Sequence, residues 1–219
     1  MGRPARHAEA KILECARQIS AQTGPRSLTI AAVAERAGAP VGSIYYRHAS
    51  RDEILATIWL DLVEAFQHSF LAPLENEVDP VEAGLAAVTF TCTWVRSHPV
   101  EARLLLIHRR EDFAADRWSA RHRERAEVLT ERAEARLRRY ALRLLGRGGA
   151  AQLRTIRFAL IDLPAAALRR DVEAGATPSG EVETLLLETC AFVLRQVAGS
   201  EAPAVRISAR RRSVRKEQG

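Results

Sequence analysis

The spacing of apolar residues is the feature that most constrains the fold of this 219-residue chain. Apolar side chains return every three to four positions over most of its length, which places them on one face of a helix. A half-buried strand needs strict alternation instead, and no segment of four to eight residues alternates cleanly. The sequence therefore predicts an all-α protein in two parts, with its core between packed helices.

Turn and capping signals divide the first third of the chain into four helices. Gly24-Pro25 ends the first helix and Gly38-Ala39-Pro40 separates the second from the third. Ser50 and Glu53 have the spacing of a capping box that begins a fourth, long helix. The predicted helices are about 6–22, 30–37, 41–47 and 51 to Ala72-Pro73. In the third helix, Ile44 and Tyr45 are expected to point inward.

The rest of the chain continues the helical pattern. Asp79 and Pro80 are a typical N-cap and first helical residue. Trp118 is expected on the apolar side of a long charged helix, and Pro164 is expected to interrupt or bend the helix that follows. The predicted segments are 79–97, an apolar run over 104–107, and helices over about 116–145, 150–171 and 181–198.

The net charge of +6 is concentrated at the two ends of the sequence. Residues 1–50 carry a net charge of +4, residues 203–219 carry +5, and the stretch between them carries −3. We therefore expect an N-terminal domain over 1–50, a helical body over 51–202, and a basic, disordered tail over 203–219. A basic N-terminal segment favours a polyanionic partner, above all nucleic acid, and the tail is either a solvated end or an arm on the DNA backbone.

Two short helices joined by a glycine-containing turn, followed at once by a long capped helix, match a helix-turn-helix. The third predicted helix is too short to stand alone, so its neighbours must support it and its outward face is left free. That face offers Val41, Gly42 and Ser43, and an exposed glycine is a poor choice for helix stability. The pattern indicates a backbone that approaches a partner closely, such as the wall of a DNA major groove.

The run from Leu28 to Leu55, LTIAAVAERAGAPVGSIYYRHASRDEIL, resembles the DNA-binding domain of the TetR family of bacterial transcriptional regulators. The segments Val-Ala-x-x-Ala-Gly, Ser-Ile-Tyr-Tyr and Arg-Asp-Glu-Ile-Leu are specific in combination. The resemblance extends over about 6–66, and beyond that only the order and lengths of the helices match. His48 is a departure, because the family usually has an aromatic residue there, most often Phe, packed under the fourth helix.

The resemblance implies that this segment binds double-stranded operator DNA. Thr29, Tyr45 and Tyr46 are then expected at phosphates, and Arg51 stands where a phosphate-contacting lysine is common. Tyr45 has an alternative interpretation as a core residue, and Arg51 as a solvated charge. The full set of expected DNA-binding residues is Thr29, Ala31, Val41, Gly42, Ser43, Tyr45, Tyr46, Arg47 and Arg51.

The resemblance also implies a body that binds a ligand and a second copy of the chain. In similar proteins the middle helices enclose an apolar pocket, and the last two helices form a four-helix bundle in a homodimer. A dimer also lets two recognition helices reach successive major grooves, about 34 Å apart. Candidate pocket residues, each with ordinary packing as the alternative, are Phe90, Trp94, Leu105, His108, Phe113, Trp118, Arg125 and Phe158. Candidate interface residues, with the same alternative, are Ala165, Ala166, Ala167, Leu186, Thr189, Cys190 and Val193.

Several other functions are excluded by what the sequence lacks. It has no Gly-rich phosphate loop, nucleophile elbow, His-Glu metal motif or acid/base carboxylate pair, so we expect neither an enzyme, nor a cofactor, nor a metal. Cys15, Cys92 and Cys190 are too far apart for a zinc pattern and are expected to be buried as small hydrophobic residues. No apolar run nears about eighteen residues and nothing reads as a secretory signal, which predicts a cytoplasmic protein.

Two functions remain. The first is a homodimeric repressor that a small-molecule ligand releases from its operator, with the fourth helix transmitting the change. The second is a constitutive or partner-controlled DNA-binding regulator without a small ligand.

Overall fold

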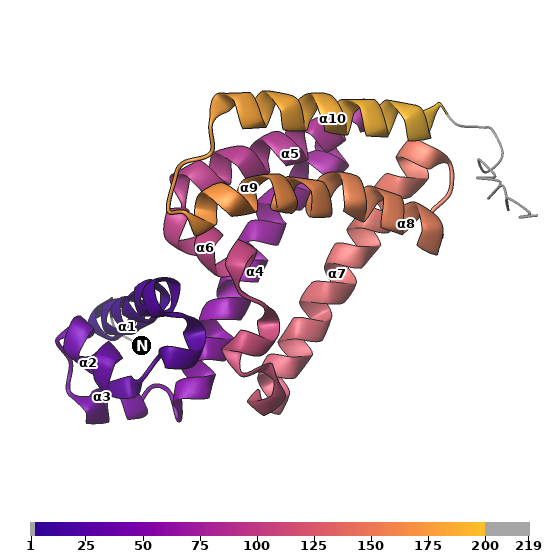
Figure 1. The fold of residues 1–219 in the computed structure, drawn as a ribbon. Coiled ribbons are helices and arrows are strands. Elements are labelled where there is room, and N and C mark those ends of the chain that lie inside the picture. Colours follow the sequence, from indigo (N-terminus) through magenta and orange to yellow (C-terminus); the bar gives the residue numbers. More distant parts are fainter. Residues whose placement is uncertain (1–2, 200–219) are drawn as a thin grey trace, which may run out of the picture.

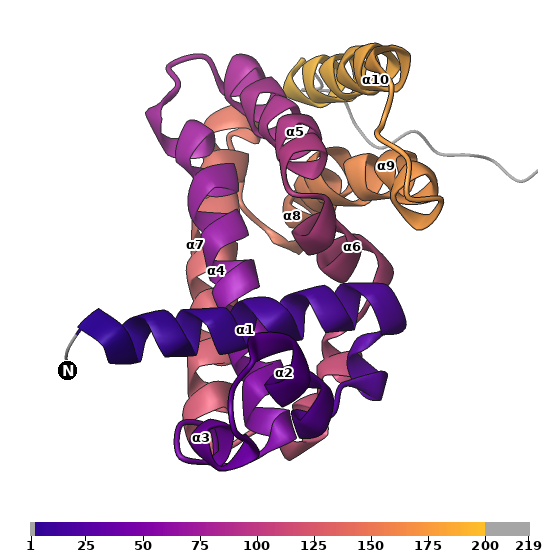
Figure 2. The same ribbon diagram turned by 90° about the vertical axis from the view of Figure 1, so that its left-hand side faces the viewer.

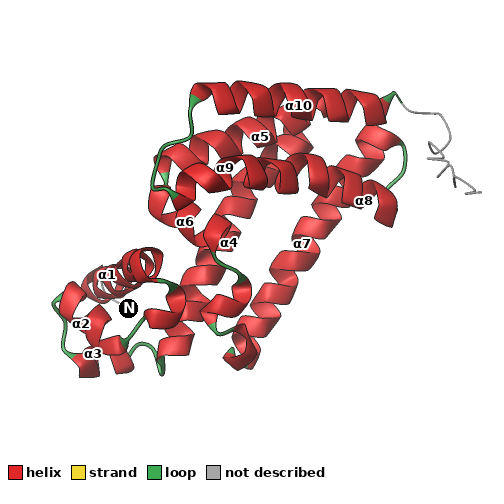
Figure 3. Ribbon diagram, in the orientation of Figure 1, coloured by secondary structure: helices red, strands yellow, loops and turns green. Residues whose placement is uncertain are grey.

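The structure is a computed structural model that describes residues 3–199, and within that range every regular element is helical (Figures 1 and 3). This confirms the all-α prediction. The basic tail over 203–219 lies outside the described residues. The α-helices are α1 (Arg3–Thr23), α2 (Ile30–Ala37), α3 (Val41–Tyr45), α4 (Arg51–Asn76), α5 (Pro80–Ser97), α6 (Pro99–Ile107), α7 (Ala120–Leu145), α8 (Ala150–Arg157), α9 (Leu163–Glu173) and α10 (Gly180–Ala198).

The first three helices form a unit at one end of the molecule, with α1 crossing α4 (Figure 2). The side-chain oxygen of Thr29 accepts the Ala32 N–H at 3.1 Å and begins α2. Gly38 ends it in the left-handed conformation at φ 63°, which a side chain would strain. The predicted second helix is thereby confirmed, and Val33 and Ile44 anchor α2 and α3 in the core.

The long helix α4 belongs to both parts of the molecule, and α7 packs along it (Figure 1). Its predicted end at Pro73 is wrong, because the helix continues to Asn76. A proline in the last turn removes only its own N–H, and Glu77 still donates to the Pro73 carbonyl at 3.1 Å. The predicted capping box is also only half formed: Ser50 accepts the Glu53 N–H, but the Glu53 carboxylate accepts from Ala49 instead.

The helix α7 begins at Ala120, later than predicted. Two short 3-10 turns, η2 (Arg110–Phe113) and η3 (Ala115–Arg117), precede it and are joined by Ala114 at φ 58°. Trp118 therefore lies before the helix, buried, with its indole N–H donating to the Phe113 carbonyl at 2.8 Å.

The helix predicted over 150–171 is interrupted, as expected from Pro164, and the interruption is a π-helical stretch, η4 (Phe158–Asp162). Pro164 has no N–H for the carbonyl four residues earlier, so the backbone widens by one residue. Leu163 accordingly donates to the Phe158 carbonyl, five residues back.

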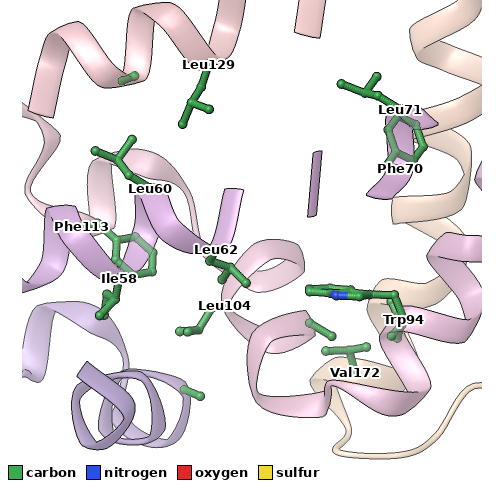
Figure 4. Packing of buried hydrophobic residues seen from close by; sticks show 14 of the residues in the cluster. Ile58, Leu60, Leu62, Phe70, Leu71, Trp94, Leu104, Phe113, Leu129 and Val172 are labelled. Carbon is green, nitrogen blue, oxygen red and sulfur yellow. The ribbon is translucent and has the colours of Figure 1, made fainter. Parts of the chain in front are cut away.

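One hydrophobic core runs through both parts of the molecule. Figure 4 shows part of it, including Ile58 and Leu62 of α4, Leu104 of α6 and Phe113 of the loop after α6. Gly84 lets α5 approach α7 and α10, because a Cβ there would collide with the Tyr140 hydroxyl and with Leu194. Across residues 3–199, no helix combines the length and apolar character of a membrane span.

Candidate DNA interface and ligand cavity

The outward face of α3 is exposed, and its side chains point away from the rest of residues 3–199. Tyr46 is 89% exposed and Tyr45 is 53% exposed, and a Cβ added at Gly42 would meet no atom within 4 Å. The prediction that Tyr45 points inward is therefore wrong. On a five-residue helix only Ile44 reaches the core, and the next side chain is turned away from it.

The other residues predicted at DNA lie on or beside this face. Thr29 and Ala31 are exposed at the start of α2, as is Val41 at the start of α3. The Thr29 oxygen accepts the capping bond, so its hydroxyl hydrogen remains available to an acceptor such as a phosphate oxygen. Arg47 is held on α3, where its guanidinium donates to the Ser43 carbonyl at 2.8 Å and to the Ser43 hydroxyl at 2.7 Å.

Arg51 is engaged within the protein. Its guanidinium donates to the carbonyls of Leu28 at 2.6 Å, Pro25 at 3.0 Å and Arg26 at 2.6 Å, and it pairs with Asp52 at 3.0 Å. These bonds tie the turn between α1 and α2 to the start of α4. Most of the guanidinium N–H donors are thus used within the protein, and a phosphate contact by Arg51 stays a prediction.

His48 fills the position under α4 that the resemblance assigns to an aromatic residue. It is buried, and within the described part of the chain its Nε2 has no hydrogen-bond partner. Burial lowers the pKa of His48, and Arg47 adds to this effect against the opposing carboxylates of Glu9 and Glu53. The ring is therefore neutral near pH 7.

Arg103 of α6 joins the DNA-binding unit to the body. Its Nε donates to the carbonyl of Ala21, in the last turns of α1, at 2.9 Å. Another nitrogen donates to the carbonyls of Val172 and Glu173, at the end of α9, at 3.0 and 3.2 Å. A cation among carbonyls at two helix C-termini is electrostatically favoured. Sequence analysis missed this contact.

The loop after α6 makes a second connection to the DNA-binding unit. Arg26, beside the turn between α1 and α2, pairs with Asp112 at 2.9 Å, and Arg117 pairs with Asp52 at the start of α4 at 2.9 Å. The pKa of Asp112 is lowered mainly by the Arg109 backbone N–H, with Arg26 contributing. We call Arg103 and these two ion pairs the bracket. Each surface pair is weak alone, but together they hold α6 and its loop against α1 and α4.

The body contains an apolar cavity of about 330 Å³ that is partly open to its surroundings. Its polar side chains are Gln67 and Thr91, and the Thr91 hydroxyl already donates to the Ala87 carbonyl at 3.0 Å. A cavity of this size and lining suits a small apolar molecule. The lining residues are Trp59, Val63, Phe66, Gln67, Phe70, Leu71, Thr91, Trp94, Val95, Leu105, Leu106, Ala133, Leu137, Leu160, Ile161 and Ala165.

Comparison with known proteins agrees with the geometry of the DNA face. The sequence model of a family described as "Bacterial regulatory proteins, tetR family" matches residues 12–58, which span most of the helix-turn-helix unit and the start of α4. The helix-turn-helix unit of this chain therefore belongs to the TetR family. The protein is a DNA-binding transcriptional regulator, and regulators of this family are not enzymes.

Solved structures show that the whole fold of this TetR-family chain recurs. PfmR from Thermus thermophilus is 19% identical, with a TM-score of 0.66 over 85% of this chain and 95% of that one. FadR from Bacillus subtilis, solved in complex with stearoyl-CoA, is 12% identical, with a TM-score of 0.64 over 87% and 98%. The ketosteroid regulator KstR2 of Mycobacterium tuberculosis is 16% identical, with a TM-score of 0.63 over 85% and 93%. No curated protein matches the sequence.

Two of the predicted pocket residues, Trp94 and Leu105, line the cavity of this TetR-family protein. Phe113 and Trp118 instead belong to the core near the DNA-binding unit, where Phe113 packs on Trp59 with ring centroids 4.6 Å apart. His108 lies beside Phe113 and Asp112.

The other predicted pocket residues also lie elsewhere. Phe90 packs on Phe66, and Phe158 is half exposed. Arg125 pairs with Asp61 and Glu64 in a groove outside the cavity. Sequence analysis missed the aromatic wall that α4 contributes. Its signal was present as three aromatic residues at helical spacing, Trp59, Phe66 and Phe70, but the same spacing is typical of ordinary core residues.

The residues predicted at the dimer interface lie in several different environments. Leu186 and Cys190 are buried within the single chain, and the Cys190 thiol donates to the Ala159 carbonyl at 3.2 Å, so they are core residues. Ala165 lines the cavity, Ala166 is exposed, and Ala167, Thr189 and Val193 are partly buried. Larger apolar side chains are exposed on the same helices and were missed: Phe158, Ile161, Leu185 and Phe192.

The three cysteines are all buried and unpaired with one another, as expected of small hydrophobic residues. Burial raises the pKa of both Cys92 and Cys190 to about 11, which makes their thiols unreactive near pH 7.

Proposed function

We propose that this protein is a homodimeric repressor that leaves its operator when a small apolar molecule fills the cavity. The observation that carries the proposal is that the cavity and the DNA face are connected within one chain by α4 and by the bracket. Two of the similar structures support a ligand-responsive role, since one was solved with stearoyl-CoA and the other is named a ketosteroid regulator.

For the DNA contact, we propose the exposed face of α2 and α3. Val41, Gly42 and Ser43 approach the base edges, and thymine methyl groups and DNA shape supply much of the specificity. Tyr45 and Tyr46 donate their hydroxyls to phosphates. The contacting set is Thr29, Ala31, Val41, Gly42, Ser43, Tyr45, Tyr46 and Arg47, whereas Arg51 positions the turn before α2.

For the dimer, we propose a bundle formed by the α8–α9 segment and α10 with their counterparts in a second copy. Leu185 is 66% exposed and Phe192 is 65% exposed, and they are seven residues apart on one face of α10. Phe158 and Ile161 are exposed on the neighbouring segment. Exposed large apolar residues of this kind are typical of an interface.

The organisation that we propose is a DNA-binding unit over 1–50 and a body over 51–202 in a cytoplasmic regulator, with α4 shared between the two parts. Leu105 and Leu106 of α6 and Ala165 of α9 line the cavity, and the same two helices hold α1 through Arg103. A ligand that spreads α6 and α9 therefore displaces α1 and changes the spacing of the two DNA faces in the dimer. It acts by favouring the geometry that does not fit DNA.

The test is fluorescence anisotropy on a duplex from the DNA flanking the protein's own gene, at two salt concentrations and against a scrambled duplex. We expect tight binding that exceeds binding to the scrambled control at both salt concentrations. Equal and steeply salt-sensitive binding to both duplexes would count against a specific operator on that DNA. The same assay then detects ligands by release. Ligands that raise the melting temperature while releasing DNA separate this function from a constitutive regulator without a ligand.

A further inference from the structure

A second, polar hollow lies directly against the apolar cavity, between α4 and α7. Gln67 and Leu71 of α4 belong to the walls of both, so these two residues separate an apolar space from a charged one. We call the second hollow the arginine groove. It is lined by Asp61, Glu64, Ala65, Gln67, His68, Leu71, Arg125, Leu129, Arg132 and Arg136.

The charges of the arginine groove are unevenly compensated. Both carboxylates, Asp61 and Glu64, are taken by Arg125, at 2.8 Å for Asp61. Arg136 pairs with Glu75 at 3.3 Å. In the part of the chain that the structure describes, Arg132 makes no ion pair. The lining of the groove carries three arginines against two carboxylates, a net charge of +1, and it includes the Gln67 amide, for which residues 3–199 supply no hydrogen-bond partner.

We propose that the ligand is a single-chain amphiphile with one negatively charged head group, such as a carboxylate. Its apolar chain fills the cavity, and its head group passes Gln67 and pairs with Arg132 in the arginine groove. This inference rests on the proposed function, since it names the chemical class of the molecule that the cavity takes.

The chemistry of the two spaces supports this class over the alternatives. A charge inside the cavity has no partner among its apolar walls, so a charged head group must lie outside them. A guanidinium forms strong, charge-assisted hydrogen bonds with a carboxylate, and the Gln67 amide N–H is a further donor at the boundary. A cationic head group is disfavoured, because three arginines line the groove and Arg125 already pairs with both of its carboxylates.

The test compares three probes that share a ten-carbon chain and differ in charge: decanoate, decanol and decyltrimethylammonium. Trp59 and Trp94 line the cavity, so intrinsic tryptophan fluorescence reports binding, at concentrations below those at which the probes form micelles. We expect decanoate to bind about tenfold more tightly than decanol, and the cationic probe to bind most weakly. Equal binding of decanoate and decanol, tightest binding of the cation, or no binding of any probe would overturn the inference.

The variant Arg132→Gln removes the groove arginine that makes no ion pair within residues 3–199 and lowers the net charge of the lining from +1 to zero. It is expected to lower the affinity for decanoate about tenfold, to that for decanol, and to leave decanol binding unchanged. Arg138→Gln is the matched control, because Arg138 is exposed on the same helix and lines neither the cavity nor the groove. An equal loss of decanoate binding in both variants would overturn the role of Arg132.

The variant Ala133→Phe extends a side chain into the cavity and is expected to abolish binding of decanoate and decanol alike. If it does not fold, Ala133→Val is expected to weaken both. Unchanged binding of both probes to a folded variant would overturn the placement of the chain.

DNA release, followed by anisotropy in the same samples, separates this inference from the proposed function. Binding that depends on Arg132 but releases no DNA leaves the ligand class standing and refutes the repressor mechanism. Release of DNA by another molecule, without any preference for an anionic chain, supports the repressor mechanism and refutes the ligand class.

Discussion

On α3, a side chain added at Gly42 would meet no atom within 4 Å, whereas on α5 one added at Gly84 would collide with Tyr140 and Leu194. The two glycines show how differently the two regions of the molecule use small residues. In the DNA-binding unit the space outside the protein is kept free for a partner. In the body the space between helices is closed as far as packing allows, except at the cavity.

The largest expected effect comes from placing a large side chain at Gly42, on the exposed face of α3. Gly42→Leu should leave the melting temperature within a few degrees of the parent, because a Cβ there meets no atom within 4 Å and the position is exposed. We expect specific DNA affinity to fall by at least about 30-fold, roughly 2 kcal/mol or more, since α3 can no longer approach the groove. Anisotropy and thermal unfolding measure the two quantities. Ala151→Leu, at an exposed alanine of α8, should leave DNA affinity unchanged. Undiminished affinity of Gly42→Leu would show that α3 does not enter the groove.

The converse change fills the inward space. In Gly84→Ala the new methyl group pushes Tyr140 and Leu194 away from α5. Overpacking of this kind lowers the free energy of unfolding by about 1–3 kcal/mol. For a chain of this size that lowers the melting temperature by roughly 2–12 °C. Gly180→Ala is the matched control, because a Cβ there meets no atom within 4 Å. An unchanged melting temperature for Gly84→Ala would contradict the close approach of α5 to α7 and α10.

A smaller effect is expected where the two regions meet. Arg103→Gln removes hydrogen bonds from α6 to the carbonyls near the ends of α1 and α9, and we expect a loss of about 1–2 kcal/mol. Hydrogen exchange in the last turn of α1 should quicken, and a ligand that releases DNA from the parent should release it less effectively from the variant. Arg169→Gln, an exposed residue of α9, is the control. Equal release from parent and variant would remove Arg103 from the coupling.

The smallest effect concerns pH. Burial lowers the pKa of His48, so below about pH 6.5 the unfolded chain binds a proton that the folded state resists. Stability is therefore fully present above that pH and falls as the solution is acidified. His48→Phe should remove this contribution and the unpaired Nε2, raising the melting temperature by roughly 2–4 °C at pH 7 and by more at pH 5.5. A pH profile of His48→Phe that is identical to the parent's would refute the assignment.

Much of the helix-turn-helix could be predicted because its determinants are local. Thr29 and Gly38 bound α2 through their own side chain and backbone conformation, and Asp79 begins α5 in the same way. The errors occur where the structure around a residue overrides the local signal of its sequence. Pro73 was interpreted as a helix end although its loss of one N–H is tolerated, and Tyr45 was placed inside although α3 is too short to bury two side chains.

The connections between the regions could not be predicted from residue types. Arg103 binds backbone carbonyls 69 to 82 positions away. Every residue has a backbone carbonyl, so the sequence does not indicate which of them Arg103 binds. The cavity has the same difficulty, because its empty volume depends on how far α4, α5 and α7 are held apart. The aromatic residues of α4 that form its wall follow the same spacing as those of the core.

The π-helical stretch Phe158–Asp162 has a consequence for how this protein can change over evolutionary time. A π-turn holds one residue more than the α-turn it replaces, so it sets the rotational phase of α9 relative to α8. Deleting one residue there would turn every later side chain of the segment by about 100°. Ala165 would then leave the cavity and Leu168 the core, while the helix-turn-helix would keep its structure.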